Sequence, residues 1–204
     1  EEDAFTIASE AESYLNAMFE FGYPPVHLMG ISYGGLIAME IGASAPQMLR
    51  SLAVALVGCR VAPGMRTELR RLAQLARRES WREFHAGMAN ALHYHSSFKP
   101  LFAAIAWSAP RLLGVPEDPQ RVARMLEAFA GADLSERLPR ISVPALIVAG
   151  DRDPYVTEEI LSETAAALPQ GDLALWKGAG HSLLRARPEE VEERIIAFFK
   201  AAEE

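Results

Sequence analysis

The stretch VHLMGISYGG, residues 26–35, decides the fold. It opens with a short, mainly apolar run led by a β-branched valine, Val26–Met29, which predicts a strand. The residues after the glycines, Leu36–Ile41, suit a helix. Ser32 is therefore expected at a turn between a strand and a helix, where it is either a nucleophile or an ordinary turn serine.

Residues 30–34 (GISYG) fit the G-x-S-x-G pattern of a nucleophile elbow. In such an elbow the serine backbone is strained, and Gly30 and Gly34 lack bulk so that strand and helix can approach each other. Gly35 is expected to give further clearance. The pattern alone is short, so a glycine-flanked serine at a helix cap stays the alternative.

Length and composition describe one sizeable globular core. The chain has 204 residues, half of them hydrophobic, and a formal net charge of −7. This charge gives no electrostatic reason to expect a nucleic-acid partner. No apolar run approaches a bilayer-spanning length, and the first residues, Glu1-Glu2-Asp3, do not resemble a signal peptide. We expect a cytoplasmic protein with neither nucleic-acid nor membrane partners.

The single cysteine, Cys59, follows an apolar run at residues 53–58. We interpret it as a small core residue rather than a reactive thiol, and a chain with one cysteine fits a reducing compartment.

Hydrophobic patterning predicts alternating strands and helices. Strands buried on both faces are expected at Val26–Met29, Leu52–Val57 and Ala145–Ala149, with a weaker fourth at Leu173–Trp176. Helical patterns flank them, the first at Phe5–Phe19 and the last at Glu189–Lys200. This order predicts an α/β fold with a mainly parallel sheet flanked by helices.

Residues 60–140 show helical periodicity and no convincing strand. A loop of that length is implausible, so we expect a helical cap inserted between two strands. The chain then divides into a core, residues 1–60 and 140–204, and a cap, residues 61–139. The first cap helix is basic, and we interpret its arginines as a solvated face, with an anion-binding patch as the alternative: Arg66, Arg70, Arg71, Arg77, Arg78 and Arg82.

A serine nucleophile needs a base, and the chain has five histidines. His181 lies in the glycine-rich segment GAGHS, residues 178–182, after the last predicted strand. The carboxyl ends of parallel strands are where open α/β sheets bind ligands. Packing or surface roles are expected for the others, with no metal site: His27, His85, His93 and His95.

The base needs a group that orients it, and two aspartates follow the third predicted strand. Asp153 lies further into the loop AGDRDP, residues 149–154, while Asp151 is expected to cap the turn through its own backbone. Ordinary turn chemistry is the alternative for both.

Three motifs in this order resemble the α/β-hydrolase family, in particular its capped esterases, lactonases and peroxidase-like members. They are GISYGG at 30–35, VPALIVAGDRDPYV at 143–156 and GAGHSLLRARPEEV at 178–191. The resemblance spans essentially the whole chain. It implies Ser32 as nucleophile, His181 as base and Asp153 as acid, with the backbone N–H of Tyr33 in the oxyanion hole and no metal or organic cofactor.

The chain departs from that family before the elbow. Family members have several strands there, with a loop that donates a second oxyanion-hole amide, whereas only one helix precedes the elbow here. We therefore expect an N-terminally incomplete core whose elbow strand has a bare edge, completed by a missing segment or by a second chain.

The expected function is a serine hydrolase that cleaves a carboxylic ester, lactone or thioester through an acyl-enzyme. The alternatives are an acyltransferase or perhydrolase on the same triad, and a ligand receptor or non-catalytic scaffold. Aromatic cap residues predict a small ester-like substrate with an apolar group: Trp81, Phe84, Tyr94, Phe98, Phe102, Trp107 and Phe129.

Overall fold

A computed structural model describes residues 5–92, 97–108 and 113–203. Four parallel strands form one sheet in the order β1-β2-β3-β4. Their bounds are β1 Val26–Ile31, β2 Leu49–Ala55, β3 Ala145–Gly150 and β4 Gly171–Trp176. The predicted parallel α/β architecture is confirmed.

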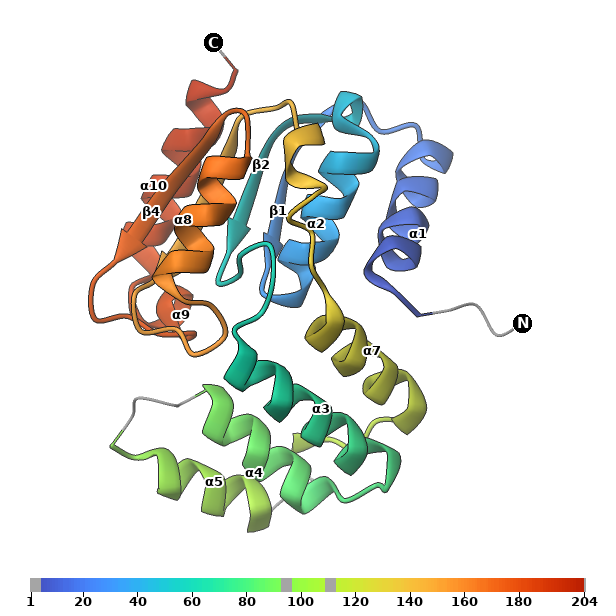
Figure 1. The fold of residues 1–204 in the computed structure, drawn as a ribbon, viewed down its shortest axis with the longest axis vertical. Coiled ribbons are helices and arrows are strands. Elements are labelled where there is room, and N and C mark those ends of the chain that lie inside the picture. Colours follow the sequence, from blue (N-terminus) through green and yellow to red (C-terminus); the bar gives the residue numbers. More distant parts are fainter. Residues whose placement is uncertain (1–4, 93–96, 109–112, 204) are drawn as a thin grey trace.

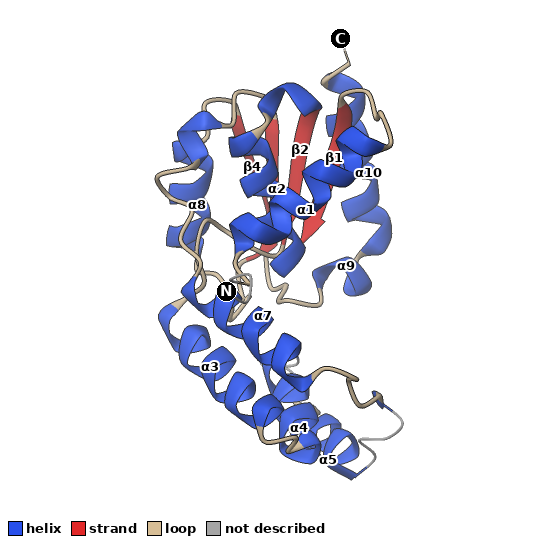
Figure 2. Ribbon diagram, turned by 90° about the vertical axis from the view of Figure 1, so that its right-hand side faces the viewer, coloured by secondary structure: helices blue, strands red, loops and turns tan. Residues whose placement is uncertain are grey.

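Helices cover both faces of the sheet (Figures 1 and 2). One face packs against α1 Ile7–Glu20, α2 Tyr33–Ser44 and α8 Glu158–Ala167; the other packs against α9 Leu183–Ala186 and α10 Pro188–Ala201. Because side chains alternate along a strand, Val54 joins the core on the α2 side while Ala53 and Ala55 join the core on the α10 side. The core therefore has two layers, divided by β2 and β3.

The burial expected for the strands holds only in the middle of the sheet. Residues of β3 are buried throughout, and β2 has one exposed residue, Arg50. The prediction is wrong for β1 and β4, because each pairs with one neighbour among the described strands. In β1 the residues Met29 and Ile31 are 37% and 46% exposed.

The second strand was predicted at Leu52–Val57, but β2 begins three residues earlier and ends at Ala55. Leu56 takes a positive φ of 63°, which turns the chain out of the sheet. The turn leads through the fully buried Cys59, confirming its place in the core, into the segment that precedes α3.

The described helices between β2 and β3 lie beyond the carboxyl ends of the strands (Figure 1). We call them the cap helices: α3 Pro63–Arg77, α4 Trp81–Leu92, α5 Lys99–Ser108 and α7 Pro119–Gly131. Proline begins α3, where a missing N–H is tolerated, and Leu69 and Leu72 lie on its buried face. The exact core and cap boundaries stay a prediction.

The chain enters and leaves the cap side by side, through an antiparallel bridge between Arg60 and Asp133. Arg60 also pairs with Glu163 on α8, so this junction is tied to the core. None of the helices in the described segments is long and apolar enough to cross a membrane.

Candidate active site

Ser32 lies at the turn between β1 and α2, as its flanking residues predict. Its backbone has φ 52° and ψ −121°, a conformation that costs free energy for a non-glycine residue. A hydrogen bond from Ser32 N–H to the Ala55 carbonyl, 2.8 Å long, holds the turn against β2. Tyr33 is the first residue of α2, so its N–H lacks an acceptor within the helix and is available to a ligand.

The glycines around Ser32 differ in how much space a side chain would find. A Cβ on Gly30 would lie 2.4 Å from the Gly34 carbonyl oxygen, and a Cβ on Gly35 would lie 2.5 Å from Cγ1 of Val57. A Cβ on Gly34 would meet no atom within 4 Å in the described part of the chain. The expectation that Gly34 must lack bulk is therefore wrong here, because the close approach on the helix side falls on Gly35.

The structure brings Ser32, His181 and Asp153 together. Oγ of Ser32 lies 3.1 Å from Nε2 of His181, and Nδ1 of His181 lies 2.7 Å from Oδ2 of Asp153. The His181 side chain is 6% exposed and that of Asp153 is fully buried. Each distance permits a hydrogen bond, so a chain of contacts runs from the serine hydroxyl to the buried carboxylate.

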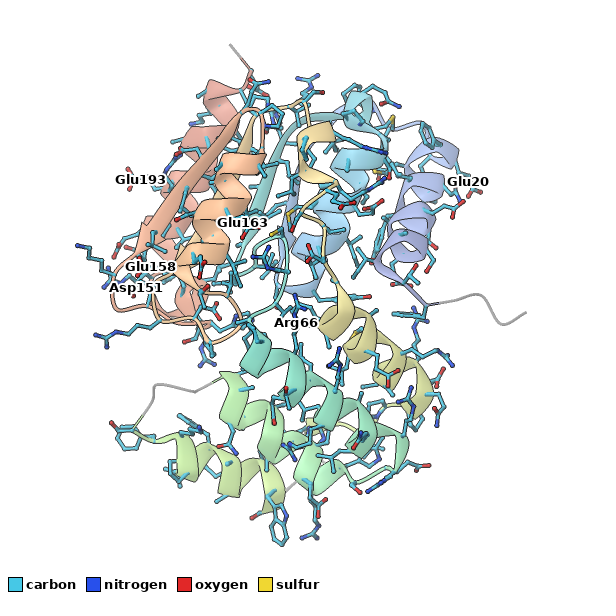
Figure 3. The ribbon with its side chains drawn as sticks, viewed as in Figure 1. Glu20, Arg66, Asp151, Glu158, Glu163 and Glu193 are labelled. Carbon is cyan, nitrogen blue, oxygen red and sulfur yellow. The ribbon has the colours of Figure 1, made fainter. Side chains whose placement is uncertain are left out.

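The two aspartates after β3 have different partners. The remaining oxygen of Asp153, Oδ1, accepts the N–H of Tyr155 at 2.9 Å, which fixes the carboxylate plane. Asp151 lies at the end of the sheet nearest the cap helices (Figure 3). Its Oδ1 accepts the N–H of Gly178 at 2.6 Å, so it bonds the loop before His181 and does not cap its own turn as expected.

Sequence reasoning missed the residues that support His181. The Tyr155 ring lies against the imidazole with a centroid distance of 4.2 Å, and Phe129 of α7 stacks on the other side of Tyr155. A Cβ on Gly150 would lie 2.1 Å from the Ala179 carbonyl oxygen, so only glycine lets the two loops meet. Both Gly150 and Tyr155 lie in the motif at 143–156, but no periodicity marks their roles.

Two tyrosines beside the site stay neutral at ordinary pH. Burial raises the pKa of Tyr33 to about 12, with smaller contributions from Glu10 and Tyr14. Burial also raises the pKa of Tyr155, and the charges of Asp153 and Glu68 act in the same direction. The Tyr33 hydroxyl is buried and has no hydrogen-bond partner among the described residues.

The other candidates lie elsewhere. His27 contacts Ser51 at 2.7 Å, and His85 in the cap contacts the Gly114 carbonyl at 3.0 Å. His93, His95 and Tyr94 lie outside the described residues. Of the described cap aromatics, Phe129 reaches the site through Tyr155; the others are buried within the cap or exposed: Trp81, Phe84, Phe98, Phe102 and Trp107.

Among the described residues, no group of three or more His, Cys, Asp or Glu side chains is placed to hold a metal ion. What the site offers is a serine hydroxyl, an imidazole, a carboxylate and a free backbone N–H, which is the set that nucleophilic acyl transfer requires.

Known proteins show similarity along most of the chain. A protein of Azorhizobium caulinodans named as a candidate carbamate hydrolase, RutD, is 24% identical over 95% of this chain and 73% of its own length. A pimeloyl-[acyl-carrier protein] methyl ester esterase of Xanthomonas oryzae pv. oryzae is 26% identical over 91% of this chain and 75% of its own length. These relatives act, by name, on carbamate and ester groups.

Solved structures establish the fold. MGS-M2, an alpha/beta hydrolase enzyme from a deep-sea metagenome library of the Medee basin, superposes with a TM-score of 0.79 and 18% identity, covering 98% of this chain and 74% of that one. The enol-lactonase of Burkholderia xenovorans LB400 gives a TM-score of 0.76 and 22% identity over 96% and 73%. A family model described as "Alpha/beta hydrolase family" matches residues 1–194, and this chain therefore belongs to the alpha/beta hydrolase family.

Proposed function

We propose that the protein is a serine hydrolase that cleaves a carboxylic ester, lactone or thioester through an acyl-enzyme. The observation that carries the proposal is the buried series of contacts from Ser32 through His181 to Asp153, at 3.1 and 2.7 Å. A strained serine at a strand-to-helix turn presents its hydroxyl to the base, as a nucleophile elbow does.

The chemistry then runs in two halves. Oγ of Ser32 attacks the carbonyl carbon while Nε2 of His181 takes the hydroxyl proton, and the carbonyl electron pair moves onto oxygen. When that pair returns, the bond to the leaving group breaks, and His181 gives its proton to the departing oxygen or sulfur. Water repeats the sequence on the acyl-enzyme and releases the carboxylic acid and free Ser32.

Asp153 acts through His181. Because its carboxylate accepts from the Nδ1 side, it favours the tautomer whose Nε2 is free to take a proton from Ser32. The carboxylate also stabilises the imidazolium that forms in each half of the reaction. The backbone N–H of Tyr33 is the oxyanion donor that this chain supplies at the elbow, and one such donor is worth about 10²–10³ in rate.

The substrate class follows from the surroundings and from relatives. The Tyr155 ring packs against His181 and the Phe129 ring packs against Tyr155, so the surroundings of the base are aromatic, which favours a substrate with an apolar group next to its carbonyl. The relatives and structural neighbours include a methyl ester esterase and an enol-lactonase, which supports carboxylic esters and lactones as substrates.

Labelling with a fluorophosphonate probe tests the nucleophile. The probe should attach one phosphonyl group to Ser32 of the wild type, located by peptide mass spectrometry, and Ser32→Ala should remain unlabelled. Ser13→Ala is a matched control, because Ser13 lies on the outer surface of α1, where its hydroxyl bonds the Ser9 carbonyl.

Turnover of 4-nitrophenyl butyrate completes the test. We expect ester cleavage that is lost in Ser32→Ala and in His181→Ala and retained in Ser13→Ala. A folded wild type that neither takes the probe nor cleaves the ester would show that the site is a binding site without hydrolytic activity.

A further inference from the structure

A cavity of about 510 Å³ lies between α3, α4, α5 and the loop that carries Asp153. Pro154, which directly follows Asp153, lines it from the core, and Glu68, Arg71 and Asn90 line it from the cap. The charge of Glu68 also acts on the buried hydroxyl of Tyr155, whose ring lies against His181. The cavity therefore adjoins, on its cap side, the loop that carries the proposed acid Asp153.

Arg71 lines this cavity with a side chain that is 48% exposed, and part of its hydrogen-bonding capacity has no partner among the described residues. Its Nε and Nη2 donate to the two carboxylate oxygens of Glu68 at 2.8 and 2.6 Å. A guanidinium has five N–H donors, and no acceptor in the described part of the chain takes the other three. The arginine is thus oriented by its partner and can still donate to a ligand.

A glycine in α4 makes room for this pair. A Cβ on Gly87 would lie 2.6 Å from Nη2 of Arg71, 2.7 Å from Cδ2 of Leu72 and 3.3 Å from Oε1 of Glu68. Glycine inside a helix is unfavourable relative to alanine, because it adds backbone freedom that folding must remove. Its presence here lets the charged head groups of Arg71 and Glu68 lie against the α4 backbone.

We propose that this cavity binds an oxyanion group of the substrate, a carboxylate or a phosphate ester, through Arg71. The proposal rests on the proposed function and specifies its substrate class: an ester whose part remote from the reacting carbonyl ends in an anion. A planar guanidinium with free N–H groups matches the paired oxygens of such a group.

The charges that face the cavity allow an anion to enter. Arg71 and Lys99 are positive, Glu68 is negative, and Asn90 is neutral, so these four side chains together carry one positive charge. Of the other arginines of α3, Arg66 donates to the Val61 carbonyl, Arg77 pairs with Glu127, and Arg70 is exposed. Most of the basic helix is therefore a solvated or structural face, and Arg71 is the member set against a cavity.

Paired ester substrates test the proposal. The 4-nitrophenyl monoesters of glutaric, adipic and pimelic acids carry a free carboxylate, and the 4-nitrophenyl esters of pentanoic, hexanoic and heptanoic acids match them in carbon number. The ratio of kcat/KM for the acidic ester to that for its neutral match should fall at least about tenfold in Arg71→Gln, chiefly through KM. Gly87→Ala should lower the same ratio while Arg71 is present, because the new Cβ displaces the guanidinium.

Arg77→Gln is the matched control, since it removes an arginine of the same helix from an exposed ion pair with Glu127. For Arg77→Gln, the ratio of kcat/KM for the acidic ester to kcat/KM for its neutral match should equal that of the wild type. Equal ratios in the wild type and Arg71→Gln at all three chain lengths would overturn the proposal, as would a ratio that falls equally in Arg77→Gln.

Direct binding separates this proposal from the proposed function. Titration calorimetry on Ser32→Ala with adipate and with pentyl phosphate should show binding that Arg71→Gln weakens about tenfold or more, and the tighter ligand identifies the oxyanion. Such binding, together with a folded wild type that has no esterase activity, would refute the proposed hydrolase and keep the proposed anion site. Ester cleavage with no Arg71-dependent binding would refute the cavity and keep the hydrolase.

Discussion

The two flanks of Ser32 are built differently. On the flank of β3 and β4, which we call the paired flank, the side chains of Asp153 and His181 are 0% and 6% exposed and are hydrogen-bonded to each other. On the flank of β1, which we call the edge flank, the residues Met29 and Ile31 are 37% and 46% exposed. A cavity of about 300 Å³ lies there between β1, α2 and Tyr14 of α1.

The same difference appears in glycines and hydroxyl groups. Gly35 faces Val57 on the paired flank and leaves no room for a Cβ, whereas Gly34 leaves open space. The buried Tyr33 hydroxyl has no partner among the described residues, while both oxygens of Asp153 have one. The proposed acid and base on the paired flank are thus held by side-chain hydrogen bonds with defined partners. The edge flank contributes a backbone N–H, which constrains its neighbours far less.

The largest expected effect is on the paired flank, in a comparison of two aspartates two residues apart. Asp153→Asn should lower kcat for ester cleavage by about 10⁴, because an amide at this place favours the wrong imidazole tautomer. Asp151→Asn should lower it less than about tenfold, because the one partner of the Asp151 side chain among the described residues is the Gly178 N–H. Steady-state kinetics on both variants tests the assignment of Asp153 as the acid. A larger loss of kcat in Asp151→Asn would assign that role to Asp151 instead.

A smaller effect is expected when each of the two elbow glycines that follow Ser32 is replaced by alanine. Gly35→Ala should lower the free energy of unfolding by about 1–3 kcal/mol, because its Cβ would lie 2.5 Å from Cγ1 of Val57. Gly34→Ala should change it by no more than about 0.5 kcal/mol, because its Cβ meets open space. Urea unfolding measures both, and similar losses would show that the edge flank is as tightly packed as the paired flank.

The smallest effect concerns the pH dependence of stability on the edge flank. Burial raises the pKa of Tyr33 to about 12, above the value of about 10 expected for an unfolded chain. The folded state therefore keeps its proton to higher pH, and its stability should fall as pH rises from about 10 to about 12. Because the ring is only half-buried, we expect about 1 kcal/mol from this group, below the full linkage value.

Tyr33→Phe isolates that contribution. The difference in unfolding free energy between wild type and variant should be nearly constant below about pH 10 and should shift against the wild type above it. Other tyrosines and lysines titrate in both proteins and cancel in the difference. A difference that is flat up to pH 12 would contradict the burial of the hydroxyl.

The fold was largely predictable because its signals are local. Short apolar runs separated by helical periodicity predict a parallel sheet, and all four strands were located from them. The errors arose where tertiary neighbours decide the outcome. The burial of β1 depends on its being at the edge of the described sheet, and the end of β2 depends on the turn at Leu56, which no hydrophobic pattern encodes.

The candidate site shows the same division. The order of the G-x-S-x-G segment, the aspartates after the third strand and the histidine after the fourth is a property of the sequence by itself, because each lies at the carboxyl end of a predictable strand. Sequence alone thus determined which residue types could meet at this edge. It also placed a candidate nucleophile, a candidate acid and a candidate base in the order that the α/β-hydrolase resemblance implies.

Only the tertiary structure decided which individual side chains meet and what surrounds them. Ser32 and His181 are 149 positions apart and lie 3.1 Å from each other, and the choice between Asp151 and Asp153 depends on the direction of each carboxylate. Likewise, Arg71 is the arginine of α3 that lines the cavity beside Pro154. The physical reason is that distances of a few ångströms and the exclusion of water are set by the packing of separate segments, which local sequence patterns do not record.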